Sequence, residues 1–369
     1  MKKSLMLLIV SLLVMSLLAG CAGTTVVINE CTCPCVDAPT EHIAPVPEVT
    51  EPVQEATQPA AEGAVKTGLA VVTSVSDSTS ATAEAAGAVK YDITIAAVTV
   101  DDNGVITSCY VDSIPATVNM DATGTITTDL AAPISTKNEQ GEAYGMVAWG
   151  GAIAEWDAQV AALSSFAVGK TVDELKNGAV SESGYAPEGS DLASSATIYL
   201  GGYVAAIEAA ANNATHLGAQ NGDELTMVTL NSLSSSVSAT AEAEGTAQLD
   251  ADIAVVTTKD GVITSCIIDA VQAKISFNNT GAITTDLTAP ISTKNQLGEN
   301  YGMVAWGGAI AEWNEQAASF AAYVTGKTAE EVAGIAITET TKPADGSDLA
   351  SSVTIAIGGF QALIAKALA

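Results

Sequence analysis

The sequence has no arginine, only two histidines and few positive charges of any kind. Its 13 basic residues, all of them lysines, stand against 42 Asp and Glu, which gives a formal net charge of −29. Such a field repels nucleic acid and anionic lipid, so nucleic acid is not expected as a partner. His42 lies in a proline-rich segment and His216 in a linker, so a histidine-based hydrolase or a His-ligated metal centre is not expected.

Long apolar runs are also scarce, and the longest is at the N-terminus. Residues 5–18 form a run of about 14 residues, short of the ~20 that a membrane-spanning helix needs. Lysines precede this run and small residues follow it, which is typical of a cleaved signal peptide over residues 1–20. The following Leu18-Ala19-Gly20-Cys21 resembles the lipobox of bacterial lipoproteins. The resemblance implies a diacylglycerol on the sulfur of Cys21 and a protein held at the extracellular face of the cell membrane.

Residues 21–65 are rich in proline and acids and have little large apolar content. Such a segment cannot bury enough surface to fold, so it is expected to act as a semi-extended tether. Three cysteines within it are expected to form disulfides or to stay free, with a metal or redox role as the alternative: Cys31, Cys33 and Cys35. The remaining pair, Cys109 and Cys266, lies on alternating segments and is expected to pack as small apolar groups.

A repeat with a period of 157 residues, as from Gly104 to Gly261, sets the domain organisation. A period this long indicates a duplicated domain, because solenoid units are only ~20–45 residues long. We expect two homologous domains, 66–214 and 224–369, each of ordinary size for a core of its own. The segments shared by the two copies are 104–109 with 261–266, 132–138 with 289–295, and 144–156 with 301–313.

The first half of each domain shows the alternating pattern of antiparallel strands. The loop 101–104 is one residue longer than its counterpart 259–261, which predicts a β-hairpin, and a further turn is expected in each copy, at 121–124 and 278–281. Beyond Tyr144 the apolar spacing through Val147, Ile153 and Leu163 predicts a helix of about four turns. Thr171 and Thr328 begin capping boxes that predict a short helix, and a last apolar helix closes each domain. Strands followed by helices indicate an α+β fold.

One motif near the end of each domain bears on chemistry. Asp191-x-x-Ser194-Ser195-Ala196-Thr197 recurs as Asp348-x-x-Ser351-Ser352-Val353-Thr354. The pattern resembles the flavinylation signature of the FMN-binding domain family, in which an FAD-dependent flavin transferase joins FMN to the final threonine through a phosphoester. The resemblance implies one FMN on Thr197 and one on Thr354. The second copy departs from the family pattern at Val353, where alanine is usual.

The residue types of the motif suit that chemistry. A threonine hydroxyl can attack the pyrophosphate of FAD, and small neighbours let a transferase approach the backbone. Since the motif is expected at or near the start of the closing helix, free backbone N–H groups there could receive the phosphate in the absence of arginine. The alternative is that Ser190-Asp191 and Ser347-Asp348 only cap a helix. Segments 123–127 and 280–284 look similar but have isoleucine before the last threonine, so they are expected to be turns.

Tandem domains behind a lipobox are similar to the flavinylated surface lipoproteins of Gram-positive bacteria that serve extracellular electron transfer. The resemblance implies an electron carrier, more than a catalyst in its own right. It would receive electrons from a membrane quinol-linked donor and pass them to ferric iron, a soluble shuttle or an extracellular reductase. The alternative is a surface binding or adhesion lipoprotein whose duplicated domains add avidity and carry no cofactor.

A block of aromatic residues and methionine, 144–149, is identical in the two copies. Aromatic and thioether groups pack well on a flat ring, so these side chains are candidates to line an attached flavin. Their spacing also fits ordinary core positions, and that interpretation is favoured. The candidates are Tyr144, Met146 and Trp149, with Tyr301, Met303 and Trp306 in the second copy.

Overall fold

The computed structural model describes residues 63–369. The predictions of a signal peptide, of lipid on Cys21, of a tether and of disulfides in the leader fall outside these residues, apart from 63–65 of the tether. Within residues 63–369, no helix is long and apolar enough to cross a membrane.

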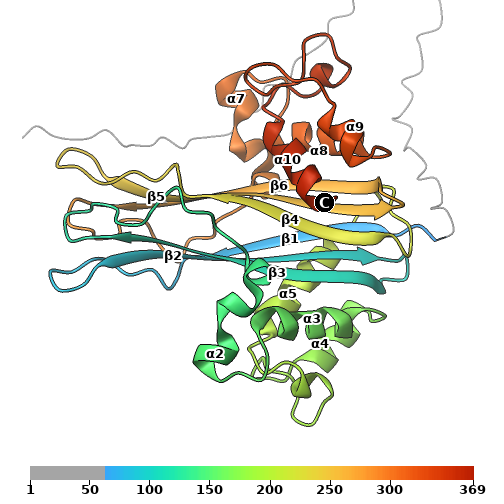
Figure 1. Cartoon of the computed structure of the whole chain (residues 1–369), viewed down its shortest axis with the longest axis horizontal. Coiled ribbons are helices and arrows are strands. Elements are labelled where there is room, and N and C mark those ends of the chain that lie inside the picture. Colours follow the sequence, from blue (N-terminus) through green and yellow to red (C-terminus); the bar gives the residue numbers. More distant parts are fainter. Residues whose placement is uncertain (1–62) are drawn as a thin grey trace, which may run out of the picture. The chain divides into compact units, whose positions relative to one another are not determined.

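Each repeat begins with a three-stranded antiparallel sheet (Figure 1). The first sheet has the order β1 (Lys66–Ser74), β2 (Gly87–Val100) and β3 (Ile106–Met120). The second has the order β4 (Glu224–Ser232), β5 (Gly245–Lys259) and β6 (Val262–Phe277). The hairpins expected at 101–104 and 259–261 are confirmed, and each has the same register shift, a β-bulge, in the ladder beside it.

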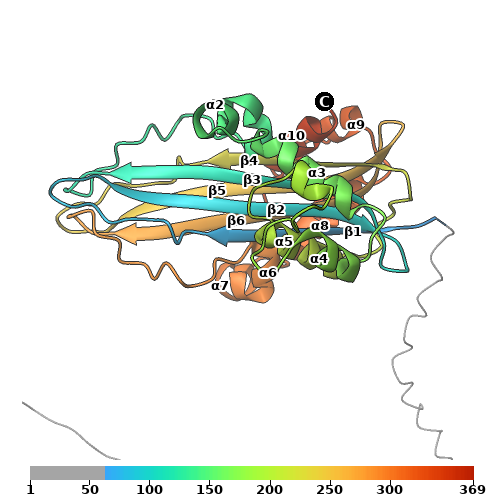
Figure 2. The same ribbon diagram turned by 90° about the horizontal axis from the view of Figure 1, so that it is seen from below.

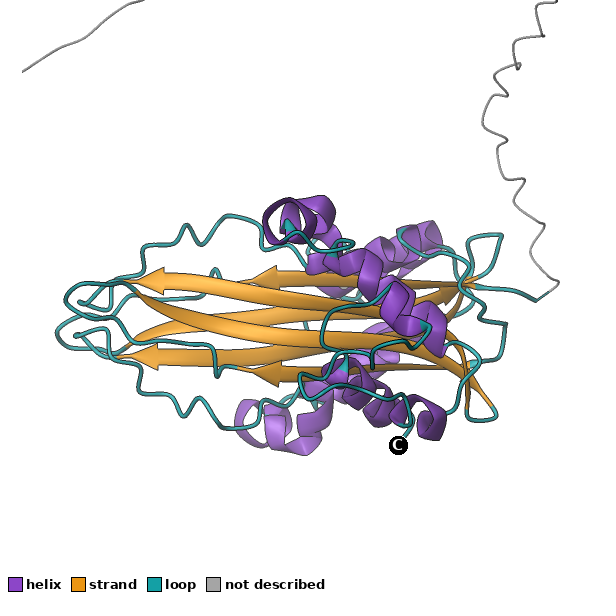
Figure 3. Cartoon of the chain, turned by 90° about the horizontal axis from the view of Figure 1, so that it is seen from above, coloured by secondary structure: helices purple, strands orange, loops and turns teal. Residues whose placement is uncertain are grey.

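Helices follow the sheet in each repeat and lie on one of its faces (Figure 3), which confirms the α+β prediction. The first set is α1 (Lys137–Gln140), η1 (Gly141–Tyr144), α2 (Met146–Gly150), α3 (Trp156–Ala167), α4 (Val172–Ala179), η2 (Leu192–Ser194) and α5 (Gly201–Asn212). The second set is α6 (Lys294–Leu297), η3 (Gly298–Tyr301), α7 (Met303–Gly307), α8 (Trp313–Val324), α9 (Ala329–Ala333), η4 (Leu349–Ser351) and α10 (Gly358–Ala367).

The local signals for helices and turns are mostly confirmed. Thr171 and Thr328 form complete capping boxes with Glu174 and Glu331, and α4 and α9 start where expected. The similar-looking segment 123–127 belongs to a turn, in which the Gly124 N–H donates to the Asp121 carbonyl. The closing helices α5 and α10 are present as well.

The single long helix expected beyond Tyr144 is wrong, because the chain breaks it in two. Gly151 adopts φ 61°, and its N–H donates to carbonyls of Met146 and Val147, which ends α2. After a short loop, α3 begins with Glu155 as its N-cap, and the Glu155 carboxylate also accepts the Met146 and Val147 N–H groups. Val147 and Ile153 are therefore exposed, 46% and 57%, where the spacing placed them in a core.

Alternate residues of the central strands serve two different cores. In β2, Ile93 and Ile95 belong to a cluster that also contains Ile253 and Val255 of β5, so the two sheets share that core. The next β2 residue, Ala96, packs instead with the helices of its own repeat, and the second repeat has an equivalent outer core. The order of layers is therefore helices, sheet, sheet, helices (Figures 1 and 2). The sequence predicted a core within each repeat but not the core between them.

Candidate functional site

The first motif folds as one tight turn ahead of the closing helix. Ser194 Oγ donates to the Asp191 carbonyl at 2.6 Å, and Leu192 and Ala196 are buried. The side chains of Asp191, Ser194, Ser195 and Thr197 are exposed. The two apolar residues thus anchor the turn, while its acidic and hydroxyl-bearing residues are exposed.

The motif lies near the start of the closing helix, as expected, but outside the helix itself. Helix α5 begins at Gly201, four residues beyond Thr197. What Ser190 caps is the short η2 turn, where its Oγ accepts the Ala193 N–H at 3.2 Å. The helix-capping alternative therefore applies to this turn and not to α5, and it leaves the Thr197 hydroxyl without a capping role.

Gln159 holds the end of the motif, and the sequence reasoning missed it. This fully buried side chain comes from α3, and its Oε1 accepts the N–H of Thr197 at 2.8 Å and of Ile198 at 3.2 Å. The Thr197 hydroxyl donates to the same oxygen at 3.3 Å. Gln159 Nε2 in turn donates to the Ala154 carbonyl at 2.8 Å, which fixes the amide orientation. The N–H groups expected to be free for a phosphate are therefore satisfied by Gln159.

The second repeat reproduces this arrangement. Gln316 is also fully buried and accepts the Thr354 N–H at 2.8 Å and the Thr354 hydroxyl at 3.2 Å. The flanking polar residues are exposed as in the first copy: Asp348, Ser351 and Ser352. Val353 is fully buried, so the departure from the family pattern lies on the inner side of the turn, away from the hydroxyl.

A cavity of about 380 Å³ lies directly beside Thr197, because the next two residues, Ile198 and Tyr199, form part of its wall. The strand β2 contributes Thr94, and α5 contributes Gly202 and Tyr203. The remaining wall consists of two aromatic residues and a methionine, together with one lysine: Tyr144, Trp156, Met146 and Lys137. Trp156 Nε1 donates to the Tyr203 hydroxyl at 3.0 Å, and the two rings meet edge to face.

The structure divides the aromatic block into two parts. Tyr144 and Met146 pack against the outer core and also line the cavity, so they lie near Thr197. Trp149 and its counterpart Trp306 are 89% and 90% exposed. The core interpretation is therefore wrong for both tryptophans. Their rings lie over Gly145 and Gly302, where positive φ values and the indoles together leave no place for a Cβ.

Lys137 supplies the positive charge of the cavity. The residue is only 6% exposed, and its Nζ lies 5.1 Å from the centroid of the Trp156 ring and 5.6 Å from that of Tyr144. The nearest carboxylate oxygen is Asp92 Oδ2, at 3.6 Å. Lys294 has the same aromatic neighbours in the second repeat, with its Nζ 4.8 Å from the centroid of the Trp313 ring and 5.3 Å from that of Tyr301. The signal in the sequence was the shared Thr-Lys-Asn segment, in which the threonine begins a capping box.

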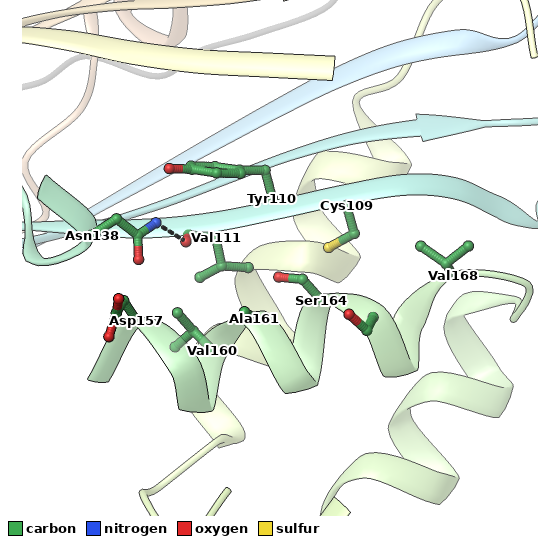
Figure 4. Close-up of a pocket in the computed structure, with 10 residues that line it drawn as sticks. Cys109, Tyr110, Val111, Asn138, Asp157, Val160, Ala161, Ser164 and Val168 are labelled. Atoms are coloured by element: carbon green, nitrogen blue, oxygen red, sulfur yellow. Dashed lines mark hydrogen bonds between the residues drawn. The ribbon is translucent and has the colours of Figure 1, made fainter. Parts of the chain in front are cut away.

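A second cavity, of about 400 Å³, lies between β3 and α3 (Figure 4). Its wall includes Cys109, Asn138 and Ser164, and Asn138 Nδ2 donates to the Val111 carbonyl at 2.9 Å. Burial raises the pKa of the Cys109 thiol to about 12, as it does for Cys266, so neither thiol is a nucleophile near neutral pH. Both cysteines are free, Cys266 being buried as expected and Cys109 partly so. The motif at Thr197 contributes no residue to the wall of this described cavity.

Comparison of the chain with family models, with curated proteins and with solved structures finds no match in any of the three. Among residues 63–369, His, Cys, Asp and Glu form no group of three or more that could hold a metal ion.

Proposed function

We propose that this chain is an extracellular electron carrier that bears FMN covalently on Thr197 and Thr354 and is anchored to the membrane by lipid on Cys21. The observation that carries the proposal is the position of Thr197, an exposed residue beside a cavity lined by aromatic rings and one buried lysine. The equivalent residues around Thr354 are Lys294, Tyr301, Met303 and Trp313.

The residues present suit FMN, which combines a flat ring with negative charge. A cavity of about 380 Å³ falls within the range of small-molecule sites. Tyr144, Met146 and Trp156 offer ring faces and a thioether, and Lys137 offers a buried cation. When bound, FMN would supply the capacity to take up and release electrons, which no side chain here has.

The chain's own contribution is to hold the attachment point still and accessible. Gln159 fixes the backbone of Thr197 and Ile198 through hydrogen bonds. Leu192 and Ala196 anchor the turn by packing into the outer core of the repeat. The exposed position of Thr197 suits attachment by an FAD-dependent flavin transferase. A membrane quinol-linked donor would load the carrier, and ferric iron, a soluble shuttle or an extracellular reductase would unload it. The net charge of −29 favours the approach of cationic acceptors.

A surface binding or adhesion lipoprotein remains the second candidate, and one observation favours it. Both repeats expose the same large apolar side chains, and exposed apolar groups of this kind mark interaction sites. They are Val147, Trp149 and Ile153, with Val304, Trp306 and Ile310 in the second repeat. This candidate predicts a colourless protein that is indifferent to substitution of Thr197 or Thr354.

The two candidates are separated by intact mass and visible absorbance. Residues 22–369 are expressed in an exported form together with a flavin transferase, as wild type, Thr197→Ala and Thr354→Ala. The matched control is Thr127→Ala, because Thr127 is an exposed threonine in the similar-looking turn segment. We expect two added FMN masses in the wild type and the control, and one in each motif variant. An unmodified, colourless wild type would favour the binding lipoprotein.

A further inference from the structure

The two repeats place different charges beside the attachment point. Thr94 lines the first cavity and pairs with Ser113 in the sheet. The residue at the equivalent position of β5 is Asp252, which pairs with Ala270, and Ser113 and Ala270 are themselves one repeat apart. A hydroxyl in the first repeat is thus replaced by a carboxyl group in the second.

Asp252 lies on the outer face of β5, at the position where Thr94 lines the first cavity. A Cβ built on Gly359 would lie 3.6 Å from Asp252 Oδ2, and Gly359 corresponds to Gly202, which lines the first cavity next to Thr94. Burial raises the pKa of Asp252, the charge of Asp250 raises it further, and Lys294 lowers it. The positive charge of Lys294 is therefore partly offset by the Asp252 carboxyl group in the same site.

The first cavity has a different set of charged and polar groups. Its lysine, Lys137, has Asp92 at 3.6 Å, and the Asp92 side chain is 57% exposed and so is well screened by water. The first cavity also carries two phenol groups, of Tyr199 and Tyr203, where the second repeat has Ala356 and Phe360. The first site thus lacks the additional carboxyl group that Asp252 supplies in the second, and it has more hydroxyl groups.

The two sites are also separated by both sheets. Ile93 and Ile95, the neighbours of Thr94, point into the core shared by the sheets, as does Ile253 beside Asp252. Thr94 and Asp252 therefore point outward, toward the helices of their own repeats. The two sites therefore lie on opposite outer faces of the paired sheets, with the shared core between them.

We propose that the two repeats are unequal and independent redox centres, with the site at Thr197 holding electrons more tightly than the site at Thr354. This inference rests on the proposed function. Reduction adds negative charge to a bound flavin, which a nearby carboxylate opposes and a nearby ammonium group favours. Each flavin is reduced by the quinol-linked donor and oxidised by the external acceptor, so the inequality needs no further reactant. One chain can then exchange electrons over two ranges of potential.

The test is the midpoint potential of each centre alone, measured by spectroelectrochemistry. Thr354→Ala leaves only the first centre and Thr197→Ala leaves only the second. We expect a higher midpoint in the chain that keeps Thr197. Asp252→Thr, added to Thr197→Ala, should raise the potential of the second centre, and Thr94→Asp, added to Thr354→Ala, should lower that of the first. Equal midpoints, or no shift with Asp252→Thr, would overturn the inference.

A second measurement needs no flavin. The carboxyl group of Asp252 is titrated by carbon-13 NMR in the chain without cofactor. We expect a pKa above that of an ordinary aspartate, which rises further in Lys294→Met because the opposing cation is gone. An Asp252 that titrates like an exposed aspartate in both chains would overturn the inference. Absence of added FMN mass would instead defeat the proposed function, and this titration would still decide whether the cavities differ in charge.

Discussion

Two buried side chains that are distant from the motif in the sequence, Gln159 and Lys137, complete the site. Gln159 reaches the motif from 38 residues upstream, and the same separation occurs between Gln316 and Thr354. Lys137 is placed by a capping box at the start of α1. The motif itself could be predicted because its pattern is local. Gln159 and Lys137 could not, since only the packing of α1 and α3 on the sheet brings them to Thr197.

Replacing Gln159 tests how the motif is held. Gln159→Leu removes the acceptor of two backbone N–H groups, and each buried orphan costs about 1–3 kcal/mol. We expect a lower unfolding free energy in urea and less FMN on Thr197, with FMN on Thr354 unchanged. Gln140→Leu is the control, because the Gln140 side chain only donates to the exposed Ser135 carbonyl. Equal stability of the two variants would show that Gln159 does not support the turn.

Asp269 predicts a dependence of stability on pH. Burial raises its pKa to about 6 although it accepts the N–H groups of Ala270 and Asn295. The folded chain therefore binds this proton more tightly than the unfolded chain, whose aspartates titrate near pH ~3.9. The contribution of Asp269 to the unfolding free energy rises as the pH falls from about 6 toward ~4 and is lost above this window.

Asp269→Asn should flatten that change, which is on the order of 3 kcal/mol for a shift of about two pKa units. The measurement is urea unfolding at pH values on both sides of the window. Asp345→Asn serves as the control because Asp345 is exposed. A wild-type curve with the same slope as the Asp269→Asn curve would contradict the assignment.

At the scale of elements, the break between α2 and α3 separates what periodicity can predict from what it cannot. The apolar spacing continues across Gly150 and Gly151, so it predicted one helix. The decisive feature is the left-handed conformation of Gly151, which turns the chain and exposes Val147 and Ile153. The strands, the capping boxes and the closing helices were predictable because their signals lie within each element.

The two adjacent glycines provide a matched pair. Gly151→Ala forces a side chain into φ 61°, which costs about 1–2 kcal/mol although no atom lies within 4 Å of the new Cβ. Gly150→Ala meets no atom either and has no positive φ, so it should leave the unfolding free energy unchanged or raise it slightly. Thermal unfolding of both variants measures the difference. Equal melting temperatures would mean that Gly151 does not end α2.

At the scale of the molecule, the two repeats are joined by more than a linker. Their sheets share one core, and polar contacts cross between them, such as the hydrogen bond of 2.7 Å between the Thr67 and Ser265 hydroxyls. The duplication was readable in the sequence, because identical segments recur at a fixed period. The packing of one sheet on the other could not be read from the sequence. The residue pattern of a strand can show that both faces are buried, but it does not show which element packs on each face.

An isolated repeat should therefore be unstable as a monomer. Residues 63–222 alone would expose the inner face of β1, β2 and β3, including Ile93, Ile95 and Ile114, which are fully buried in the intact chain. We expect this fragment to self-associate in analytical ultracentrifugation or to aggregate, because large exposed apolar faces associate. A monomer that unfolds cooperatively and is as stable as the intact chain would contradict the shared core.

The most direct test of the central claim is peptide mapping by mass spectrometry of the full chain produced with a flavin transferase. The account predicts an FMN phosphate ester on Thr197 and another on Thr354, with fragment ions that assign each to the threonine and none on Thr127. Attachment at other residues would contradict the assignment of the site, and no attachment at all would contradict the proposal of a flavin carrier.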